Sequence, residues 1–266
     1  DEGHEVVVLS PTDDYVPMLT PLYIRHIPIV INSQSRNIVN DLRALARYIA
    51  VFKSEKPDLV LAFTAKPNIY GSLAAWMTSV NIINNIAGLG TAFVKQGLFQ
   101  NFVTMLYRFS LSNSKKVFFQ NSNDRDLFIH KKVVSENISS VLPGSGVDLD
   151  AFPLCELPAK KNKSKVRFLM VCRLLWDKGI SQFYQASKLL KKKGVDAEFC
   201  ILGPLSADGN GPDESELSKM SDGITYLGKT DDVLSEMRKA NCIVLPSYYR
   251  EGVPRALLEA LATGRP

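Results

Sequence analysis

Short apolar runs alternate with longer segments of helical period along the chain. A short apolar run bounded by turn residues is typical of a buried strand, whereas apolar residues spaced three and four apart are typical of a helix. In the first half we predict strands at 6–9, 59–63, 82–86, 117–120 and 139–142, with helices at 36–53, 67–80 and 98–111. In the second half we predict strands at 166–171, 198–202, 224–227 and 242–246, with helices at 181–193, 214–220, 231–239 and 255–263.

This alternation predicts an α/β fold of two Rossmann-like, doubly wound halves with parallel sheets. From 152 to 165 the chain has prolines followed by a run of lysines, with little apolar surface to bury. We therefore place a first domain at 1–150, a linker at 151–165 and a second domain at 166–266. The sequence opens directly on a strand and stops at a helix, so we expect both domains to be truncated and the chain to be a piece of a longer protein.

The composition is that of a globular protein, with 45% hydrophobic and 22% charged residues, which excludes disordered and collagen-like chains. The net charge is +5, and no arginine array indicates a nucleic-acid surface. Small phosphorylated molecules or an acidic lipid face fit this charge. Four cysteines without a CxxC pair, and only three histidines, indicate reduced thiols in the cytoplasm and not a disulfide framework or a zinc site. No apolar run is long enough to span a bilayer.

Several common catalytic and nucleotide-binding motifs are absent from the sequence. No GxGxxG follows the first strand of either half, and in the glycine-containing run that starts at Gly88 the third glycine position is Phe93. There is also no GxxxxGK[ST] and no GxSxG. These absences argue against nicotinamide dehydrogenases, P-loop proteins and α/β-hydrolases.

Two carboxylates stand around the start of the last predicted helix. Glu251 lies in the loop before that helix and Glu259 lies about one turn into it. Gly252 lets the backbone come close to a ligand, and the N–H groups at a helix start favour a phosphate. Carboxylates beside a phosphate are expected to accept hydrogen bonds from sugar hydroxyls, and a nucleotide sugar carries both groups. The alternative is a helix-start charge at Glu251 and a solvated residue at Glu259.

Two cations lie in the loop after the strand at 166–171. Arg173 and Lys178 are five residues apart in the run CRLLWDKG. A guanidinium fork and an ammonium point charge at this spacing can hold a diphosphate. The alternative is a surface arginine and a helix-start lysine paired with Asp177. The carboxylates and the cations follow strands of the same predicted sheet, so we expect both groups at one edge of that sheet.

With these residues in view, the chain resembles family 4 of the retaining GT-B glycosyltransferases. The family's EX7E motif matches Glu251 to Glu259 as EGVPRALLE, and its diphosphate-binding pair matches Arg173 and Lys178. The run PGSGVD at 143–148 is similar to the family's usual turn before its linker. One departure is the first residue of CRLLWDKG, a cysteine where the family often has glycine.

The resemblance implies a GT-B fold in which two Rossmann-like domains face each other across a cleft. Arg173 and Lys178 would bind the donor diphosphate and stabilise the charge that grows on it, while Glu251 with the amides of Gly252 and Val253 would hold the transferred sugar. Glu259 would accept hydrogen bonds from the ribose. The segment 226–230 is a candidate for binding the base. No metal ion and no cofactor are implied.

Two runs in the first half, TAKPNIYG at 64–71 and NNIAGLGTAF at 84–93, resemble a bacterial branch that builds O-antigen, capsule and lipid-linked glycans. The resemblance implies a UDP-N-acetylhexosamine-type donor and an undecaprenyl-diphosphate saccharide acceptor. We assign to the acceptor side the polar residues at these strand ends, Lys66, Asn68, Tyr70, Asn84 and Asn85. Core-packing and turn roles are an alternative for each of them.

The predicted helix at 98–111 is apolar on most of its faces. It could lie on a membrane where a lipid acceptor sits, but its short polar face favours a buried helix.

The leading hypothesis is a retaining transferase that moves a sugar from a UDP-sugar to a lipid-linked acceptor at the cytoplasmic face of the membrane, with peripheral membrane contact. Two alternatives stay open. One is a different GT-B enzyme, such as a sugar-phosphate glycosyl synthase or a UDP-sugar epimerase. The other is a truncated, inactive module that binds nucleotides.

Overall fold

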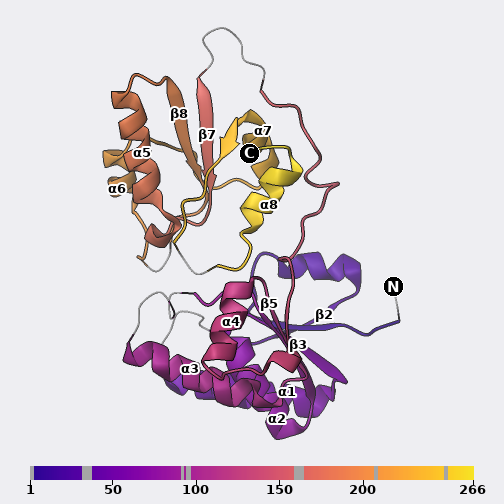
Figure 1. Ribbon diagram of the computed structural model, residues 1–266. Coiled ribbons are helices and arrows are strands. Elements are labelled where there is room, and N and C mark those ends of the chain that lie inside the picture. Colours follow the sequence, from indigo (N-terminus) through magenta and orange to yellow (C-terminus); the bar gives the residue numbers. More distant parts are fainter. Residues whose placement is uncertain are drawn as a thin grey trace. The chain divides into compact units, whose positions relative to one another are not determined.

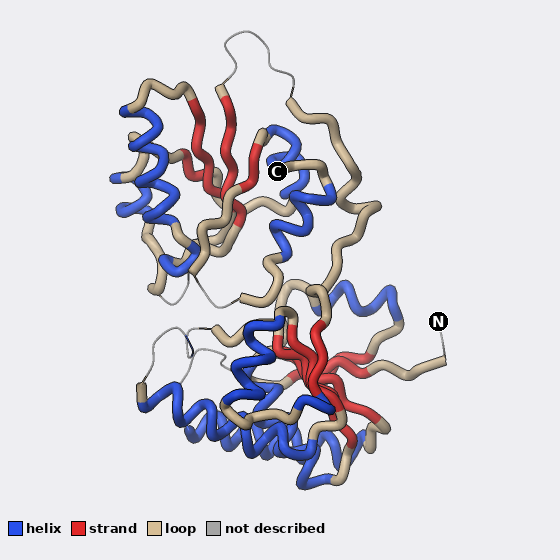
Figure 2. The backbone as a smooth tube through the Cα atoms, viewed as in Figure 1, coloured by secondary structure: helices blue, strands red, loops and turns tan. Residues whose placement is uncertain are grey.

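The computed structural model describes residues 3–31, 38–90, 93, 97–158, 165–206, 209–248 and 251–266. The chain folds into two compact units, Asp1–Leu142 and Pro143–Pro266. Strands in each unit form parallel sheets with helices packed against them (Figures 1 and 2). The predicted α/β class with parallel sheets is therefore confirmed.

The first unit contains two parallel sheets. The smaller one pairs β1 (Val7–Ser10) with β2 (Arg25–Pro28). The larger one has the order β3-β4-β5-β6; its strands are β3 (Leu59–Phe63), β4 (Asn81–Ile86), β5 (Lys116–Phe119) and β6 (Ser139–Val141). The helices of this unit are α1 (Ile38–Glu55), α2 (Ser72–Thr78), α3 (Leu98–Ser110) and α4 (Ser122–His130), with a π-helical turn at Pro67–Gly71 before α2.

Two elements of the first unit were missed by the sequence prediction. Strand β2 has the sequence RHIP and exposed ends, so it lacks an apolar run. Helix α4 has the largely polar sequence SNDRDLFIH; the side chain of Asn121 caps it by accepting from the amide of Asp124 at 2.7 Å, and the fully buried Phe128 anchors it. Short polar elements that are fixed by one cap and one anchor carry little periodicity.

The expectation of a buried helix at 98–111 is wrong for the apolar face of α3. The side chains that α3 buries are Gln100, Thr104, Tyr107 and Ser110. Most of its large apolar side chains are exposed instead.

The second unit has one four-stranded parallel sheet in the order β10-β7-β8-β9. Its strands are β7 (Val166–Val171), β8 (Ala197–Leu202), β9 (Thr225–Tyr226) and β10 (Cys242–Ile243). Its helices are α5 (Ile180–Lys192), α6 (Glu214–Lys219), α7 (Val233–Lys239) and α8 (Arg255–Ala262). Strands β9 and β10 are shorter than predicted.

The two central strands explain the register of this sheet. Leu169 and Met170 of β7 and Cys200 and Ile201 of β8 are fully buried, because side chains on both faces of the sheet are covered. Cys172 continues the pairing by donating its amide to the carbonyl of Leu202 at 3.0 Å. The loops that follow β7 and β10 therefore start from the same edge of the sheet, which is where the sequence places the candidate cations and carboxylates.

Part of the segment between the two sheets packs onto the second unit. The guanidinium of Arg265, almost fully buried, donates hydrogen bonds to the carbonyls of Cys155 and Glu156, both at 2.9 Å. Further bonds from the same side chain reach the carbonyls of Met237, Arg238 and Thr263. The stretch predicted as a linker, 151–165, thus contains residues that are anchored to the end of α8.

All four cysteines are free thiols, and Cys200 is buried. None of the helices in the described part of the chain combines the length and hydropathy needed to cross a bilayer.

Candidate functional site

The loop after β7 is fixed by a buried leucine and a glycine. Leu174 is fully buried, while its neighbour Arg173 is exposed. The chain then makes a 3-10 turn at Trp176–Lys178 and enters α5 through Gly179, whose φ of 87° lies in the left-handed region. Among the described residues, the guanidinium of Arg173 has no ion-pair or hydrogen-bond partner. The predicted cations thus stand on either side of the anchoring Leu174.

Lys178 lies against Glu251, the first carboxylate of the predicted pair. Its Nζ is 2.5 Å from Glu251 Oε2, and the two side chains are only 13% and 18% exposed. Ser247 Oγ donates to the other carboxylate oxygen, Oε1, at 2.6 Å. A partly buried carboxylate held by a cation and a hydroxyl has a fixed direction, because charge-assisted hydrogen bonds are short and directional. The structure therefore brings together the residues that the two separate sequence patterns contribute.

The loop after β10 touches the loop after β7 through the backbone. The amide of Tyr248 donates to the carbonyl of Asp177 at 3.1 Å. A Cβ atom added to Gly179 would lie 2.1 Å from the carbonyl oxygen of Pro246. Only glycine allows this approach, and the approach sets the position of Lys178 beside Glu251.

Glu259, the second carboxylate, lies on α8 and accepts from Arg255 Nε at 2.8 Å. The Glu259 side chain is 12% exposed, while that of Arg255 is 71% exposed. Pro254 is the N-cap of α8 and supplies no side-chain cap. Gly252 and Val253 are the residues directly before this cap, as the predicted phosphate or sugar site requires.

Val253 also contacts the segment that enters the second unit. A Cβ atom added to Gly144 would lie 2.9 Å from the Cβ of Val253, and Gly144 has a φ of 85°. The glycines of the run PGSGVD therefore allow this segment to pass close to the loop that carries Glu251.

Cys172 reports on the electrostatics of the site. Burial raises the pKa of its thiol to about 12, and the smaller influences on that pKa come from Lys178, Glu251 and Arg173. The thiol is therefore neutral at physiological pH. It adds no charge to a site that holds two cations and one carboxylate.

In the predicted base-binding segment 226–230, the hydroxyl of Tyr226 donates to the carbonyl of Gly203 at 2.9 Å. Burial raises the pKa of this hydroxyl. The hydrogen bond ties the end of β9 to the end of β8.

The candidate residues of the first unit fall into two groups. Lys66 Nζ lies 2.5 Å from Asp41 Oδ1, and Tyr70 donates its hydroxyl to Asp41 Oδ2 at 2.9 Å. Burial, together with this hydrogen bond, raises the pKa of Tyr70. This ion-paired group is partly accessible, since both charged side chains are 15% exposed.

The second group is an amide network in the interior of the first unit. Asn84 donates to Asn68 Oδ1 at 2.9 Å and to Ser72 Oγ at 2.8 Å, and it accepts from Ser114 Oγ at 2.7 Å. Asn68 in turn donates to the carbonyl of Asn85 at 2.9 Å. Asn68 and Asn84 are 1% and 0% exposed, which supports the packing alternative for both, and their role toward an acceptor stays a prediction.

Two residues of these clusters were not found from the sequence. Asp41 lies in the first turn of α1, and Ser247 lies four residues before Glu251. A hydroxyl one short loop away from a candidate carboxylate is a usable signal for Ser247. Asp41 had no such signal, because its partners lie 25 and 29 residues further along the chain.

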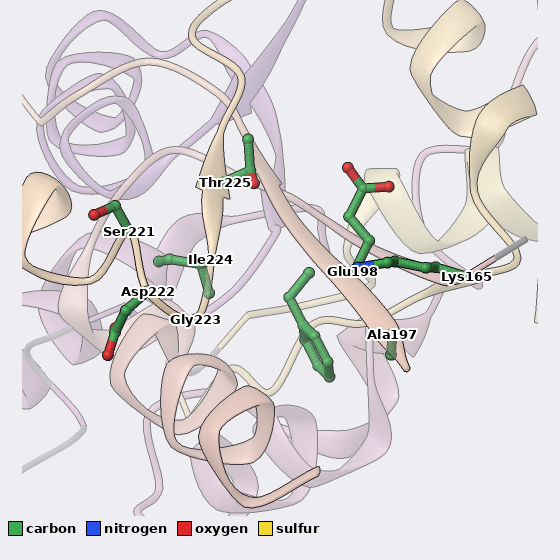
Figure 3. Close-up of a pocket in the computed structure, with 9 residues that line it drawn as sticks. Lys165, Ala197, Glu198, Ser221, Asp222, Gly223, Ile224 and Thr225 are labelled. Atoms are coloured by element: carbon green, nitrogen blue, oxygen red, sulfur yellow. The ribbon is translucent and has the colours of Figure 1, made fainter. Parts of the chain in front are cut away.

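A hollow of about 290 Å³ lies at the opposite edge of the same sheet, where β7, β8 and β9 begin. Figure 3 shows Lys165 and Glu198 on one side of it and Ser221 and Asp222 on the other. Asp222 already accepts from the hydroxyl of Tyr184 at 2.9 Å and from Lys188 Nζ. Parallel α/β sheets bind ligands at the carboxyl ends of their strands, so this hollow at the amino ends is not the candidate site.

Two family models match the chain. The model described as glycosyl transferases group 1 matches residues 157–266, and the model described as glycosyl transferase 4-like matches residues 1–121.

Three curated relatives are similar to the chain. The first is the N,N'-diacetylbacillosaminyl-diphospho-undecaprenol alpha-1,3-N-acetylgalactosaminyltransferase of Campylobacter jejuni, which is 29% identical over all of this chain and 72% of the relative. The second, UDP-Gal:alpha-D-GlcNAc-diphosphoundecaprenol alpha-1,3-galactosyltransferase of Escherichia coli, is 26% identical over 86% of this chain and 62% of the relative. The third, a capsular polysaccharide biosynthesis glycosyltransferase of Staphylococcus aureus, is 26% identical over 85% of this chain and 61% of the relative. The chain thus spans less than two thirds of the length of the last two.

Solved structures share the fold at low sequence identity. HepE of Anabaena, in complex with UDP and glucose, has a TM-score of 0.73 and 14% identity over 98% of this chain and 71% of that structure. Sucrose-phosphate synthase of Thermosynechococcus elongatus has a TM-score of 0.77 and 17% identity over 99% of this chain and 70% of that structure. These structures show the fold alone. The two glycosyltransferase family models, one in each half of the chain, together with the curated relatives, place the chain among the GT-B glycosyltransferases.

Proposed function

We propose that the protein transfers a sugar from a UDP-sugar to an undecaprenyl-diphosphate-linked saccharide, with retention of the anomeric configuration. Two of the curated relatives are named for diphospho-undecaprenol acceptors, and one solved neighbour was crystallised with UDP and glucose. The donor sugar that we propose is of the N-acetylhexosamine type, as in the name of the Campylobacter relative. The activity belongs to the biosynthesis of bacterial polysaccharide or lipid-linked glycan.

The observation that carries this proposal is the cluster formed by Lys178, Glu251 and Ser247, next to the exposed Arg173. A nucleotide sugar has its diphosphate directly beside the transferred sugar, so its site must present cations directly beside a hydrogen-bond acceptor. Lys178 and Glu251 are such a pair, at 2.5 Å. In the proposal, Lys178 and Arg173 bind the diphosphate, and Glu251 accepts hydrogen bonds from the hydroxyls of the sugar.

In the reaction, an acceptor hydroxyl oxygen forms a bond to the anomeric carbon while the bond from that carbon to the diphosphate oxygen breaks. The electron pair of the broken bond stays on the departing UDP, which takes the acceptor proton on the same face of the sugar. Arg173 and Lys178 stabilise the charge that develops on the leaving diphosphate. The proposal therefore needs no metal ion and no cofactor.

The remaining residues are assigned to binding. Glu259 accepts from the ribose hydroxyls, and the backbone amides of Gly252 and Val253 bind the donor at the start of α8. Lys66 and Asn68 belong to the acceptor side of the proposal. The lipid-linked acceptor places the protein at the cytoplasmic face of the membrane, as a peripheral protein.

Titration calorimetry with UDP tests the donor site. We expect Arg173→Ala and Lys178→Ala each to weaken UDP binding by about tenfold or more, because a charge-assisted hydrogen bond contributes roughly 1.5–3 kcal/mol. Lys192→Ala is the matched control, since it removes an exposed cation from the last turn of α5, away from the site. No UDP binding, or equal binding by all of these variants, would refute the assignment of the site.

Product analysis separates transfer from the other reactions of GT-B enzymes. We expect a glycosylated undecaprenyl-diphosphate saccharide whose new linkage has the configuration of the donor, measured by nuclear magnetic resonance. Transfer to a soluble sugar phosphate, or a changed hexose without transfer, would instead support a synthase or an epimerase.

A further inference from the structure

Helix α3 in the first unit presents an apolar face to solvent. Five large apolar side chains on this helix of 13 residues are between 44% and 89% exposed: Leu98, Phe99, Phe102, Met105 and Phe109. The sequence spacing of these residues places them along one side of a helix. Contiguous apolar surface of this kind on a folded unit marks an interaction site.

The rotation of α3 about its axis is fixed by its opposite face. Tyr107 is 3% exposed, and its ring packs edge-on against that of Phe128 with centroids 5.2 Å apart. Thr104 donates its hydroxyl to the carbonyl of Gln100, which is also buried. Turning the apolar face inward would bring Tyr107 and these polar groups to the surface. The packing of the opposite face therefore fixes the outward direction of the phenylalanines.

The segment that carries α3 contains cations but no acidic residue. From residue 97 to residue 123 the sequence has no Asp and no Glu, but three cations, Arg108, Lys115 and Lys116. Arg108 on α3 is exposed, and its guanidinium donates to the carbonyl of Lys131 at 2.6 Å, which brings the Lys131–Lys132 pair next to the helix.

This charge pattern indicates which kind of partner binds the apolar face of α3. A second copy of the chain would bring two positive surfaces together, whereas an anionic lipid surface neutralises the cations while its acyl boundary receives the apolar side chains. An exposed helix face with phenylalanines, a leucine and a methionine but no acid is the chemistry of an interfacial helix.

We infer that α3 is a membrane-docking helix whose face formed by Leu98, Phe99, Phe102, Met105 and Phe109 enters the interface of an anionic bilayer. The inference deepens the proposed function, because a lipid-linked acceptor has to be met at a membrane. It locates the contact on one helix of the first unit and assigns Arg108 and the neighbouring lysines to lipid phosphates.

Vesicle co-sedimentation tests the inference without donor or acceptor. We expect the protein to bind vesicles of equal parts phosphatidylglycerol and phosphatidylcholine, to bind pure phosphatidylcholine weakly, and to be released by salt. The double variant Phe102→Ser, Phe109→Ser should weaken binding to the anionic vesicles by about tenfold or more. Leu189→Ser is the matched control, because Leu189 is an exposed leucine on α5 in the other unit, and it should leave binding unchanged.

Three results would overturn the inference. They are no binding of the unmodified protein to anionic vesicles, equal binding by the double variant, and a dimer in analytical ultracentrifugation that the double variant abolishes without any change in vesicle binding. Calorimetry with UDP on the same double variant should show unchanged affinity, which also establishes that it is folded. Failure of UDP binding in the unmodified protein would refute the proposed function and leave the vesicle result standing.

Discussion

Lys178 is the residue in which the two sequence patterns of the second unit meet. Its ammonium is neutralised by Glu251, which keeps a partly buried cation from standing alone. In the proposed function, a diphosphate that approaches Lys178 competes with that carboxylate, and the carboxylate then accepts hydrogen bonds from the hydroxyls of the neighbouring sugar. The proposal thus makes this pair the link between recognition of the diphosphate and recognition of the sugar.

Cys172 is predicted to be chemically inert although it lies beside two cations. Burial raises its pKa to about 12, so at pH 8 only about one thiol in ten thousand is ionised, against about a quarter for a cysteine of ordinary pKa. We expect iodoacetamide at pH 8 to modify Cys172 about three orders of magnitude more slowly in the folded protein than in urea, measured by mass spectrometry of the peptide. A folded-state rate close to the rate in urea would show that the cations, and not burial, set the reactivity.

The sequence was sufficient to locate candidate residues that are marked by their type and spacing. Arg173, Lys178, Glu251 and Glu259 all lie at the carboxyl edge of the second sheet or on the helix that follows. Ser247 was not named, although it lies four residues before a candidate carboxylate, because that spacing alone does not reveal its contact with Glu251.

At the scale of elements, two loops carry the candidate site and one glycine sets their distance. The loop that ends at Gly179 and the loop that starts at Pro246 approach each other through backbone atoms. Any side chain at Gly179 must push these loops apart. The position of Lys178 relative to Glu251 therefore depends on residue 179 being a glycine, which has no side chain.

Gly179→Ala should destabilise the protein more than Gly194→Ala. Both glycines have positive φ, 87° and 75°, but an added Cβ meets the Pro246 carbonyl at the first position and nothing within 4 Å at the second. We expect about 1–2 kcal/mol for Gly194→Ala from backbone strain alone, and about 3 kcal/mol or more for Gly179→Ala. Urea unfolding measures both values, and UDP affinity should fall only for Gly179→Ala. Equal losses of stability would mean that the two loops separate without cost.

Periodicity predicted the elements better than it predicted the direction of their faces. Strands β3 and β7 have the predicted bounds, because apolar runs between turn residues leave little choice. For α3 the periodicity shows that the apolar residues share a face, but a face toward the core and a face toward a lipid interface have the same pattern. The packing that fixes the rotation of that helix, the ring of Tyr107 against that of Phe128, is a contact between separate segments of the chain.

At the scale of the whole molecule, the chain is divided into units at Leu142 and Pro143. The sequence suggested a linker at 151–165 because that stretch is rich in proline and lysine. Its first residues nevertheless carry backbone carbonyls that bind the guanidinium of Arg265. No local pattern announces a contact between residues that lie 110 positions apart.

A fragment of residues 143–266 should therefore be more stable than a fragment of residues 166–266. The shorter one removes two of the carbonyl acceptors of the Arg265 guanidinium, and each hydrogen bond from a charged group contributes roughly 1.5–3 kcal/mol. Urea unfolding followed by circular dichroism measures the difference. Arg265→Ala should destabilise the longer fragment more than the shorter one, because both fragments keep the acceptors Met237, Arg238 and Thr263 but only the longer one also has residues 155 and 156. An equal effect of Arg265→Ala in both fragments would show that the bonds to residues 155 and 156 contribute nothing.

The hydrogen bonds of Arg265 also have a consequence for the order of folding steps during synthesis of the chain. Strands β1 to β6 lie within residues 7–141, so they are synthesised before the second sheet begins, and domains fold as units in the order in which they are made. Cys155 and Glu156 are made next, but the side chain that binds their carbonyls follows 110 and 109 residues later. These two hydrogen bonds consequently form only after the whole second sheet has been synthesised, and they are a late step in the folding of that unit.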